Sequence, residues 1–322
     1  MNMAACCSIL VAGSANLDFV VRAPHVPAPG ETVLGGEARM FPGGKGANQA
    51  VACARAGGAS TQMLLALGDD AFAVPIEDSL HGAGVALHLV RVADCATGMA
   101  FVCVSDRAEN AITVAPGANA ALRPADLPAL DGIGHLLLQL ETPIDSVLAY
   151  ARAARAAGVG VVLNAAPARA LPAGLLAVVD VLIVNEGELA AISGCSGDIA
   201  SALACIDVAC VIVTLGERGC CARADGRIVL QPAFAVDAVD TTAAGDTFCG
   251  ALVAALGRGD AIAPALREAC AASALACTRP GAQSSIPARA EVAALLQRSC
   301  ANEGAAHDQR ALDGLAAYCG LA

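Results

Sequence analysis

Aromatic residues are scarce in this 322-residue chain: Phe, Trp and Tyr together make up 2% of it, and Trp is absent. Hydrophobic residues nevertheless reach 57%, so the core has to be built from Ala, Val, Leu and Ile. The same scarcity leaves few rings on which a nucleobase can stack. We therefore expect a sizeable aliphatic core, in one large domain or two small ones.

Positive charge is also in short supply. The 19 Lys and Arg residues are outnumbered by 30 Asp and Glu residues, which gives a formal net charge of −11 at pH 7. The basic residues are scattered rather than gathered in a stripe, so the chain lacks the electrostatic footprint of a nucleic-acid-binding protein. Any phosphate group has to be held by local backbone amides and a few side chains.

Long apolar runs are missing as well. No uncharged run approaches the ~18 residues that a membrane-spanning helix needs. Residues 1–18 superficially resemble a short signal segment, but no Lys or Arg precedes their apolar run. We expect a buried first strand over residues 6–13 and no association with a membrane.

Cysteine is plentiful, but its spacing argues against two common uses. The count is fifteen, which is odd, and no two cysteines have the CxxC spacing. Both facts argue against a disulfide framework and against a zinc site. Several cysteines stand in apolar runs, where cysteine acts as a small core residue: Cys53, Cys103, Cys210 and Cys249. We expect reduced thiols and a cytoplasmic protein.

Buried-strand and helix patterns alternate along most of the chain, which predicts a doubly wound α/β fold with a mostly parallel sheet. Apolar runs at 6–13, 136–140, 159–163, 178–184 and 210–214 are each followed by polar residues. Open α/β sheets bind ligands beyond the carboxyl ends of their strands. The recurring polar strand ends therefore predict a ligand site along that edge.

Two segments depart from this rhythm. Residues 17–42 and 97–117 contain short runs of alternating apolar and polar positions, which predict a small second sheet acting as a lid that excludes water. We expect a single domain over residues 1–299 with this lid inserted into it. Residues 300–322 predict a weakly helical or disordered extension, to which we assign no chemistry.

The stretch over residues 239–256 predicts an anion site. Small residues run into an apolar helix that begins at Ala244 and Gly245, so unpaired N–H groups and the positive end of the helix dipole face one spot. Asp246, on the first turn, is placed to take a proton from a hydroxyl group there. This combination suggests phosphoryl transfer, and the alternative is that Asp246 is merely an acidic residue at a helix start.

A second glycine-rich helix start lies just after Phe41. It offers close backbone approach at Gly43 and Gly44, a cation at Lys45 and an amide at Asn48. The phosphate-loop pattern GxxxxGK[ST] is not met, because glycine follows Lys45, so a polyol site fits better. The alternative is a helix cap with a solvated lysine. No GxGxxG motif follows any expected strand, which argues against a dehydrogenase.

In their order along the chain, these features resemble the ribokinase family, part of the wider group of carbohydrate and nucleoside kinases. The resemblance covers about residues 8–298. It depends on eight motifs: GSANLD (13–18), PGET (29–32), GGKGANQAV (43–51), LLQLETP (137–143), NEGE (185–188), TLGERG (214–219), DTTAAGDTF (240–248) and GAQSSIP (281–287).

The resemblance implies ATP-dependent phosphorylation of D-ribose at O5, which gives ribose 5-phosphate. It makes Asp246 the general base, with the amides of Ala243, Ala244 and Gly245 around the transferring phosphoryl group. The positions that match sugar-binding residues of the family are Asn16, Asp18, Gly44, Lys45, Asn48, Glu141 and Asp246.

The resemblance also implies ATP, Mg²⁺ and K⁺ sites, and a homodimer formed through the lid. Glu188 would organise Mg²⁺ through water. The positions that match nucleotide-binding residues are Asn185, Thr214, Gly216, Glu217, Gly219, Gly245 and Cys270. The positions that match the K⁺ site are Asp240, Thr242, Cys277, Pro280, Ala282 and Ser285.

Other readings stay open at this point. A kinase for deoxyribose, fructose or adenosine has the same motifs, although Asn16, Asp18 and Lys45 favour a free sugar. An inactive sugar-binding regulator is less favoured, because a binder needs neither Asp246 nor the NxxE motif. Two positions differ from the family pattern: NAAPA replaces NPAPA at 164–168, and Cys270 stands where a polar residue often lies near adenine.

Overall fold

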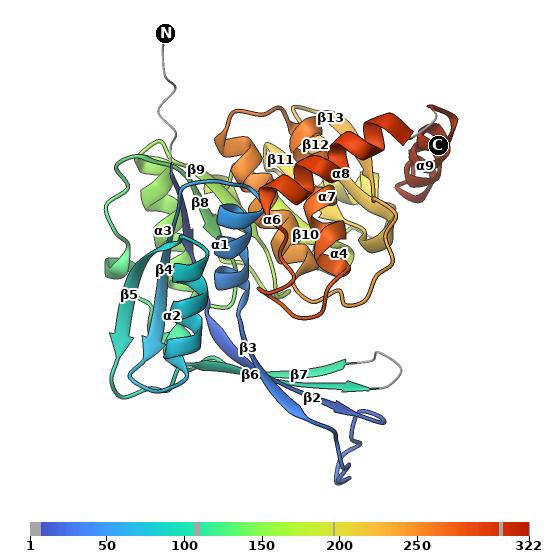
Figure 1. The fold of residues 1–322 in the computed structure, drawn as a ribbon. Helices are drawn as coiled ribbons and strands as arrows, with labels where there is room; N and C mark the ends of the chain where they lie inside the picture. Colours follow the sequence, from blue (N-terminus) through green and yellow to red (C-terminus); the bar gives the residue numbers. More distant parts are fainter. Residues whose placement is uncertain (1–7, 106–109, 196, 303–304, 322) are drawn as a thin grey trace.

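The computed structural model describes residues 8–105, 110–195, 197–302 and 305–321, and its body is a large sheet with helices on both faces (Figure 1). The strands of this sheet are β1 (Ser8–Ala12), β4 (Thr61–Gly68), β5 (Ala86–Val92), β8 (Ile133–Leu138), β9 (Gly160–Asn164), β10 (Val181–Asn185), β11 (Cys210–Thr214), β12 (Gly219–Ala224) and β13 (Arg227–Pro232). The helices are α1 (Lys45–Arg55), α2 (Ala73–Gly82), α3 (Ile144–Ala156), α4 (Glu186–Ser193), α5 (Ile199–Ala204), α6 (Ala244–Gly257), α7 (Ile262–Cys277), α8 (Arg289–Asn302) and α9 (Ala305–Tyr318).

The strand order confirms the predicted doubly wound, mostly parallel sheet. It runs β13-β12-β11-β10-β9-β8-β1-β4-β5. All neighbouring pairs from β11 to β5 are parallel, and β12 and β13 add an antiparallel edge. The five predicted apolar runs overlap β1, β8, β9, β10 and β11, so their polar ends meet at one edge of the sheet.

The core has two aliphatic layers, one on each face of this sheet. Val161 packs in the layer that includes α3, and its neighbour Val162 packs in the layer that includes α1, α6 and α7; neither has any exposed area. Because side chains alternate between faces and both faces are covered, the central strands read as continuous apolar runs.

Helices α1 and α6 pack against each other almost without side chains between them at one point. A Cβ atom built on Gly250 of α6 would lie 2.5 Å from Ala52 Cβ and 2.6 Å from the Gln49 carbonyl oxygen of α1. Only glycine permits this approach. The close crossing brings the first turns of the two glycine-rich helix starts to the same place.

The two alternating segments form a second sheet, as predicted. Its strands are β2 (Asn16–Ala23), β3 (Ala38–Gly43), β6 (Gly98–Ser105) and β7 (Asn110–Ala115), in the order β3-β2-β6-β7. Figure 1 shows this sheet standing apart from the helical layers, below the body. Residues 106–109, between β6 and β7, lie outside the described residues. The action of this sheet as a lid stays a prediction.

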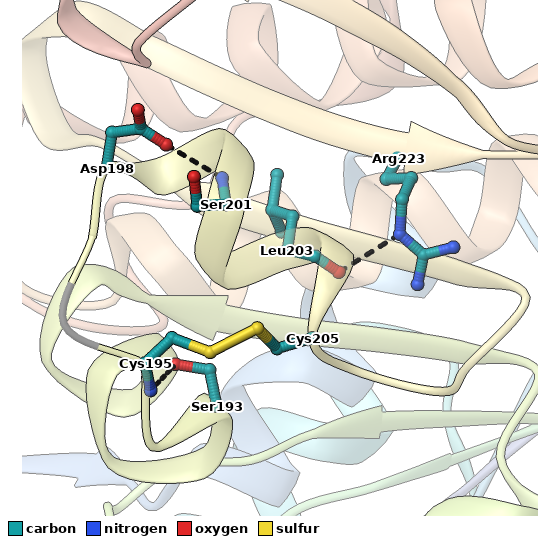
Figure 2. Close-up of a disulfide and its surroundings, with 7 residues drawn as sticks. All are labelled: Ser193, Cys195, Asp198, Ser201, Leu203, Cys205 and Arg223. Carbon is teal, nitrogen blue, oxygen red and sulfur yellow. Dashed lines mark hydrogen bonds between the residues drawn. A yellow bond between two sulfur atoms is a disulfide. The ribbon is translucent and has the colours of Figure 1, made fainter.

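The expectation of reduced thiols throughout is wrong at one place. Cys195 and Cys205, which flank the short helix α5, form a disulfide (Figure 2). Sequence spacing did not reveal it, because the pair is brought together by the turn of the chain before α5 and the end of that helix. Among the residues whose side chains are described, ten other cysteines are free, and six of these are buried, as small core residues are.

Two helices cover most of the described residues beyond 299. Helix α8 continues to Asn302, and α9 packs back onto the body, where Leu315 and Cys319 are buried. Within the described ranges, no helix is both long and apolar enough to cross a membrane.

Candidate active site

A cavity of about 250 Å³ lies at the carboxyl ends of β9, β10 and β11. These strands are parallel and in register, with Ile183 paired to Asn164 and Asn185 paired to Thr214, so their polar ends lie close together. The first turns of α1, α4 and α6 complete the walls. The lining residues are Lys45, Asn164, Ala166, Ile183, Asn185, Glu188, Thr214, Thr241, Ala243, Gly245, Asp246 and Cys249.

Asp246, the predicted base, is buried on the first turn of α6 and faces this cavity. Its Oδ2 accepts a hydrogen bond from Asn48 Nδ2 at 2.9 Å, and its Oδ1 accepts one from Gln49 Nε2, also at 2.9 Å. Two amide donors from α1 therefore fix the orientation of the carboxylate. An acid that served only the helix dipole would not need partners on another helix.

Gln49 is a site residue that the sequence reasoning missed. Its Nε2 also donates to Asn164 Oδ1 at 3.0 Å, and its Oε1 accepts from Gln139 Nε2 at 2.6 Å. All three amide side chains are buried. The available signal was a polar pair, Asn48 and Gln49, inside an otherwise apolar helix pattern. The chain of amides links the ends of β8 and β9 to the carboxylate of Asp246.

The predicted sugar residues gather beside Asp246. Asp18 is close enough to Glu141 and Asp246 for their charges to act on it: burial first, and then these two carboxylates, raise the pKa of Asp18 to about 7. Burial opposes the charge of Lys45, but Asp246, Glu141 and Glu188 outweigh it and raise the lysine pKa. Four acids and one cation thus share a small polar region.

Two of these residues are held by hydrogen bonds to neighbouring strand ends. Asn16 Oδ1 accepts from Asn119 Nδ2 at 2.8 Å, and Glu141 Oε2 accepts from Ser14 Oγ at 2.6 Å and from the Lys45 N–H at 3.2 Å. Asn119 and Ser14 were not predicted. Their hydrogen bonds hold Asn16 and Glu141 in place before any ligand binds.

Gly43 and Gly44 let the backbone come close to these groups. A Cβ on Gly43 would lie 2.0 Å from Asp18 Oδ2, and one on Gly44 would lie 2.8 Å from Ala15 Cα, with Gly44 at a φ of +89°. Asp18 Oδ1 and Asn48 Oδ1 are both buried, and neither has a hydrogen-bond partner within the described structure. Unpaired buried oxygens are costly, so these two atoms point to a ligand that donates hydrogen bonds.

We expect Asp18→Asn to change how stability depends on pH. The ordinary pKa of 3.8 rises to about 7 on folding, so the wild-type carboxyl stabilises the fold fully below about pH 4 and loses that contribution as pH rises through 7. Asparagine cannot titrate. Between pH 4 and pH 7, the unfolding free energy of the variant should therefore increase relative to that of wild type. The increase should be at most about 4 kcal/mol.

Urea unfolding at several pH values measures this gain. Asp70→Asn is a matched control, because hydrogen bonds from Thr97, Phe72 and Ala73 outweigh desolvation and lower the Asp70 pKa. Its offset from wild type should stay constant between pH 4 and 7. If the unfolding free energies of Asp18→Asn and wild type change in parallel with pH, the pKa of Asp18 is not raised on folding.

The NxxE motif forms a capping box at the start of α4. Glu188 N–H donates to Asn185 Oδ1 and Asn185 N–H donates to Glu188 Oε2, both at 2.8 Å. Burial raises the pKa of Glu188, against the Asn185 hydrogen bond and the Lys45 charge. Both residues nevertheless line the cavity. One motif thus starts the helix and presents a carboxylate to the site.

The other predicted nucleotide residues are not all brought together. Thr214 lines the cavity, and Gly216 and Gly219 follow it with φ values of +57° and +106°. Glu217 is exposed on the turn between them. Cys270 lies in α7 with 5% of its area exposed, and its Sγ is 3.7 Å from Cys220 Sγ, so it packs in the core rather than on the cavity.

The turn before α6 has the strained backbone of a functional loop. Ala243 lies at φ +59°, a left-handed conformation that costs a non-glycine residue about 1 kcal/mol or more. Ala244 N–H donates to the Thr241 carbonyl at 3.2 Å, and Thr247 N–H donates to the Ala243 carbonyl at 2.8 Å. The N–H groups of Gly245 and Asp246 precede the first possible i−4 bond of the helix, which leaves them available for an anion.

Asp240 joins the two loops that were predicted to hold K⁺. Its Oδ1 accepts from the Thr242 N–H at 2.9 Å and from Thr242 Oγ1 at 2.6 Å, and its Oδ2 accepts from the Gly281 N–H at 2.9 Å. These hydrogen bonds outweigh desolvation and lower the pKa of Asp240. The carboxylate therefore stays charged and ties the 239–243 turn to the 277–285 loop.

The predicted carbonyl ligands are already engaged in this geometry. The Cys277 carbonyl accepts from the N–H groups of Val239 and Asp240, and the Ala282 carbonyl accepts from the N–H and Oγ of Ser285. Within the described residues, the Pro280 carbonyl accepts from Ser284 Oγ alone, at 3.2 Å. The oxygen donors suit K⁺ chemically, but two of the carbonyls would have to give up hydrogen bonds to bind it.

Comparison with known proteins agrees with this geometry. The model of the pfkB family of carbohydrate kinases matches residues 7–289. A ribokinase of Haemophilus influenzae is 38% identical over 91% of this chain and 99% of its own length. A deoxyribokinase of Salmonella typhi is 33% identical over 87% of this chain and 95% of its own length.

A solved structure of Arabidopsis thaliana ribokinase, complexed with ribose and ATP, superposes with a TM-score of 0.83 at 34% identity, covering 90% of this chain and 99% of that one. The buried acid at the head of α6, the polar strand ends and these likenesses lead to one conclusion. The chain belongs to the pfkB family of carbohydrate kinases.

Proposed function

We propose that this protein phosphorylates D-ribose at O5 with ATP, giving ribose 5-phosphate and ADP. The observation that carries the proposal is the placement of Asp246, buried at the head of α6 and held by Asn48 and Gln49 inside the cavity. The ribokinase relatives, one of them named with ribose and ATP, support the choice of substrates.

In the proposed reaction Asp246 takes the proton of the sugar hydroxyl while the hydroxyl oxygen attacks the γ-phosphorus of ATP. The bond from that phosphorus to the β–γ bridging oxygen breaks, and ADP leaves with the electron pair. The amides first predicted for this role were those of Ala243, Ala244 and Gly245, but the Ala244 N–H already donates to the Thr241 carbonyl. The N–H groups of Gly245 and Asp246, together with the Lys45 ammonium, therefore stabilise the charge on the transferring phosphoryl oxygens. Positioning and electrostatics supply most of the acceleration in such a reaction.

Sugar recognition rests on hydroxyl-matching groups. Asp18 Oδ1 and Asn48 Oδ1 are unpaired acceptors, and Asn16 and Glu141 lie beside them in positions fixed by Asn119 and Ser14. Such a site rejects analogues that lack a hydroxyl, because buried polar groups are then left without partners. We propose that the second sheet closes over this region as a lid.

Mg²⁺ is proposed to act with the nucleotide, with Glu188 as its protein contact through water. Glu188 engages only Oε2 in a hydrogen bond within the described residues, so a carboxylate oxygen remains for a hydrated cation. Mg²⁺ usually keeps several waters and takes its other ligands from substrate phosphates. When bound, it neutralises charge on those phosphates.

The substrate assignment is tested by measuring ATP consumption with ribose, 2-deoxyribose, fructose and adenosine. We expect ribose to have the highest kcat/KM. Deoxyribose is the strongest rival because of the 33% identical deoxyribokinase relative, and adenosine is disfavoured because no Trp and few other rings are present. Absence of ribose turnover refutes the proposal, and binding of ribose without any turnover indicates the sugar-binding regulator.

K⁺ is proposed as an activating cation at Asp240, with Thr242, Cys277, Pro280, Ala282 and Ser285 as the candidate oxygen ligands. The charged, loop-tying carboxylate supports this, although carbonyls of Cys277 and Ala282 must exchange hydrogen bonds for the ion. Running the same assay in K⁺ and in Na⁺ decides it. Equal rates in the two salts exclude K⁺ activation.

A homodimer through the second sheet is proposed because that sheet exposes large apolar side chains. Met40, Phe101, Ile112 and Val114 are 60%, 50%, 57% and 44% exposed. Sedimentation analysis of wild type and of Phe101→Ser measures the dimer.

We also propose a cytoplasmic location, where ATP is made. A disulfide such as Cys195–Cys205 is rare in that compartment. Cell fractionation checks the location.

A further inference from the structure

The helix α9 lies beyond the part of the chain that the family model matches, yet its last residue contacts the start of α4 and the turn after β11, both next to the site. Tyr318 Oη donates to Glu186 Oε1 at 2.6 Å. The guanidinium carbon of Arg218 lies 4.3 Å from the centre of the Tyr318 ring, a cation–π contact. One side chain therefore links the start of α4 to the turn after β11.

The end of α9 is firmly anchored next to Tyr318. Leu315 and Cys319 are 3% and 0% exposed, and the Cys319 carbonyl accepts from the Ala200 N–H at 3.0 Å. A Cβ on Gly320 would lie 2.2 Å from Asp198 Oδ2, at a φ of +78°, so only glycine allows this approach. Figure 2 shows the anchoring turn, where Asp198 caps α5 through Ser201 beside the disulfide.

The two linked positions follow neighbouring strands of the site. Glu186, the first residue of α4, directly follows Asn185, which ends β10 and lines the cavity. Arg218 closes the turn Gly216–Arg218 after Thr214 of β11, and Asn185 and Thr214 are paired in the sheet. Tyr318 ties the start of α4 to this turn just outside the sheet, at the side predicted to bind the nucleotide.

We infer that Tyr318 is a positioning residue for the nucleotide: by pairing with Glu186 and Arg218 it holds the Gly216–Arg218 turn against the start of α4, in the arrangement that binds ATP. The inference rests on the proposed use of ATP. Glu186 and Arg218 are both exposed and Tyr318 is 41% exposed, so each contact is individually weak. Their effect comes from fixing this turn against a helix start that the Asn185–Glu188 capping box already holds, so that nucleotide binding does not have to order the turn.

Tyr318→Phe separates the hydrogen bond from the ring contact. The variant keeps the ring over Arg218 and loses the donor to Glu186, and we expect about a threefold rise in the KM for ATP. The KM for ribose and kcat at saturating ATP should not change. Tyr318→Leu, which also loses the cation–π contact, should raise the KM for ATP further. The double variant Tyr318→Phe with Glu186→Gln should be no worse than the worse single variant.

Asp313→Asn is the matched control, because Asp313 lies on the same helix and pairs only locally with Gln309 in the described contacts. It should leave both KM values as in wild type. Unchanged KM for ATP in both Tyr318 variants overturns the inference, as does an equal rise in the KM for ribose, which indicates general loosening. If wild type shows no ribose turnover, the proposed function fails instead, and calorimetric binding of ADP to wild type and Tyr318→Phe still tests the inference.

Discussion

Asp246→Asn should lower kcat by about 10³-fold, in the middle of the range for loss of a general base. The amide has nearly the shape of the carboxylate but cannot accept the hydroxyl proton. Binding of ribose, measured by calorimetry, should stay within about threefold of wild type, because the effect is confined to the transition state.

The surroundings of Asp246 make this substitution unusually clean. One oxygen of the new amide can still accept from Gln49, while its NH₂ group would face the NH₂ group of Asn48. Asn48 Oδ1 is buried and has no hydrogen-bond partner in the described structure, so Asn48 can rotate its amide and accept from the new donor. The hydrogen bonds around position 246 are thereby restored. The Asn48 NH₂ group then takes the place of Oδ1 toward the sugar, where it can donate to a hydroxyl oxygen, so the main loss is the basicity.

A second helix-start acid serves as the control. Asp198 caps α5 through Ser201 N–H at 2.8 Å and lies outside the cavity. Asp198→Asn should leave kcat unchanged, since asparagine is an equally good cap. If Asp246→Asn instead loses ribose affinity and kcat by the same factor, or behaves like Asp198→Asn, the acid is not the base.

Much of the fold was predictable because its signals are local. The apolar runs over β8, β9, β10 and β11 and the polar residues after them identified both the sheet and its ligand edge. Two helix starts, at Lys45 and Ala244, were likewise visible from their glycines. Period and turn chemistry are properties of neighbouring residues, so a single sequence displays them.

The missed features depend on contacts that local patterns do not display. Gln49 meets Asp246 across 197 positions, and the polar pair that it forms with Asn48 does not say which residue it contacts. Cys195 and Cys205 pair because the chain turns before α5. Cys270 lies in the core against Cys220, although the family resemblance placed it near the nucleotide. Tyr318 lies in a weak helical pattern, and its partners Glu186 and Arg218 are 132 and 100 residues away.

Gly250→Ala should destabilise the protein by about 2 kcal/mol, although alanine favours helix over glycine by about 1 kcal/mol. The new methyl group would lie 2.6 Å from the Gln49 carbonyl oxygen and 2.7 Å from the Cys53 nitrogen. Both are backbone atoms of α1, so no side-chain rotation relieves the overlap, and the two helices have to move apart.

That movement should also reduce catalysis. Asn48 and Gln49 lie on α1 and hold Asp246 of α6, so the separation of the helices becomes an error in the position of the carboxylate. A misplacement of about 1 Å can cost on the order of 100-fold in rate. We expect kcat to fall by at least about tenfold at a temperature where the variant is still folded.

Gly257→Ala, on the same helix, is the matched control. The nearest atoms to its Cβ are 3.8 Å away, which is ordinary van der Waals contact. It should be neutral or stabilise by up to about 1 kcal/mol, with kcat unchanged. Urea midpoints and kcat for the two variants give the comparison. Equal stability of both would mean that the α1–α6 crossing has room to adjust, and that the position of Asp246 is set by the amide chain through Gln139 and Asn164 rather than by helix contact.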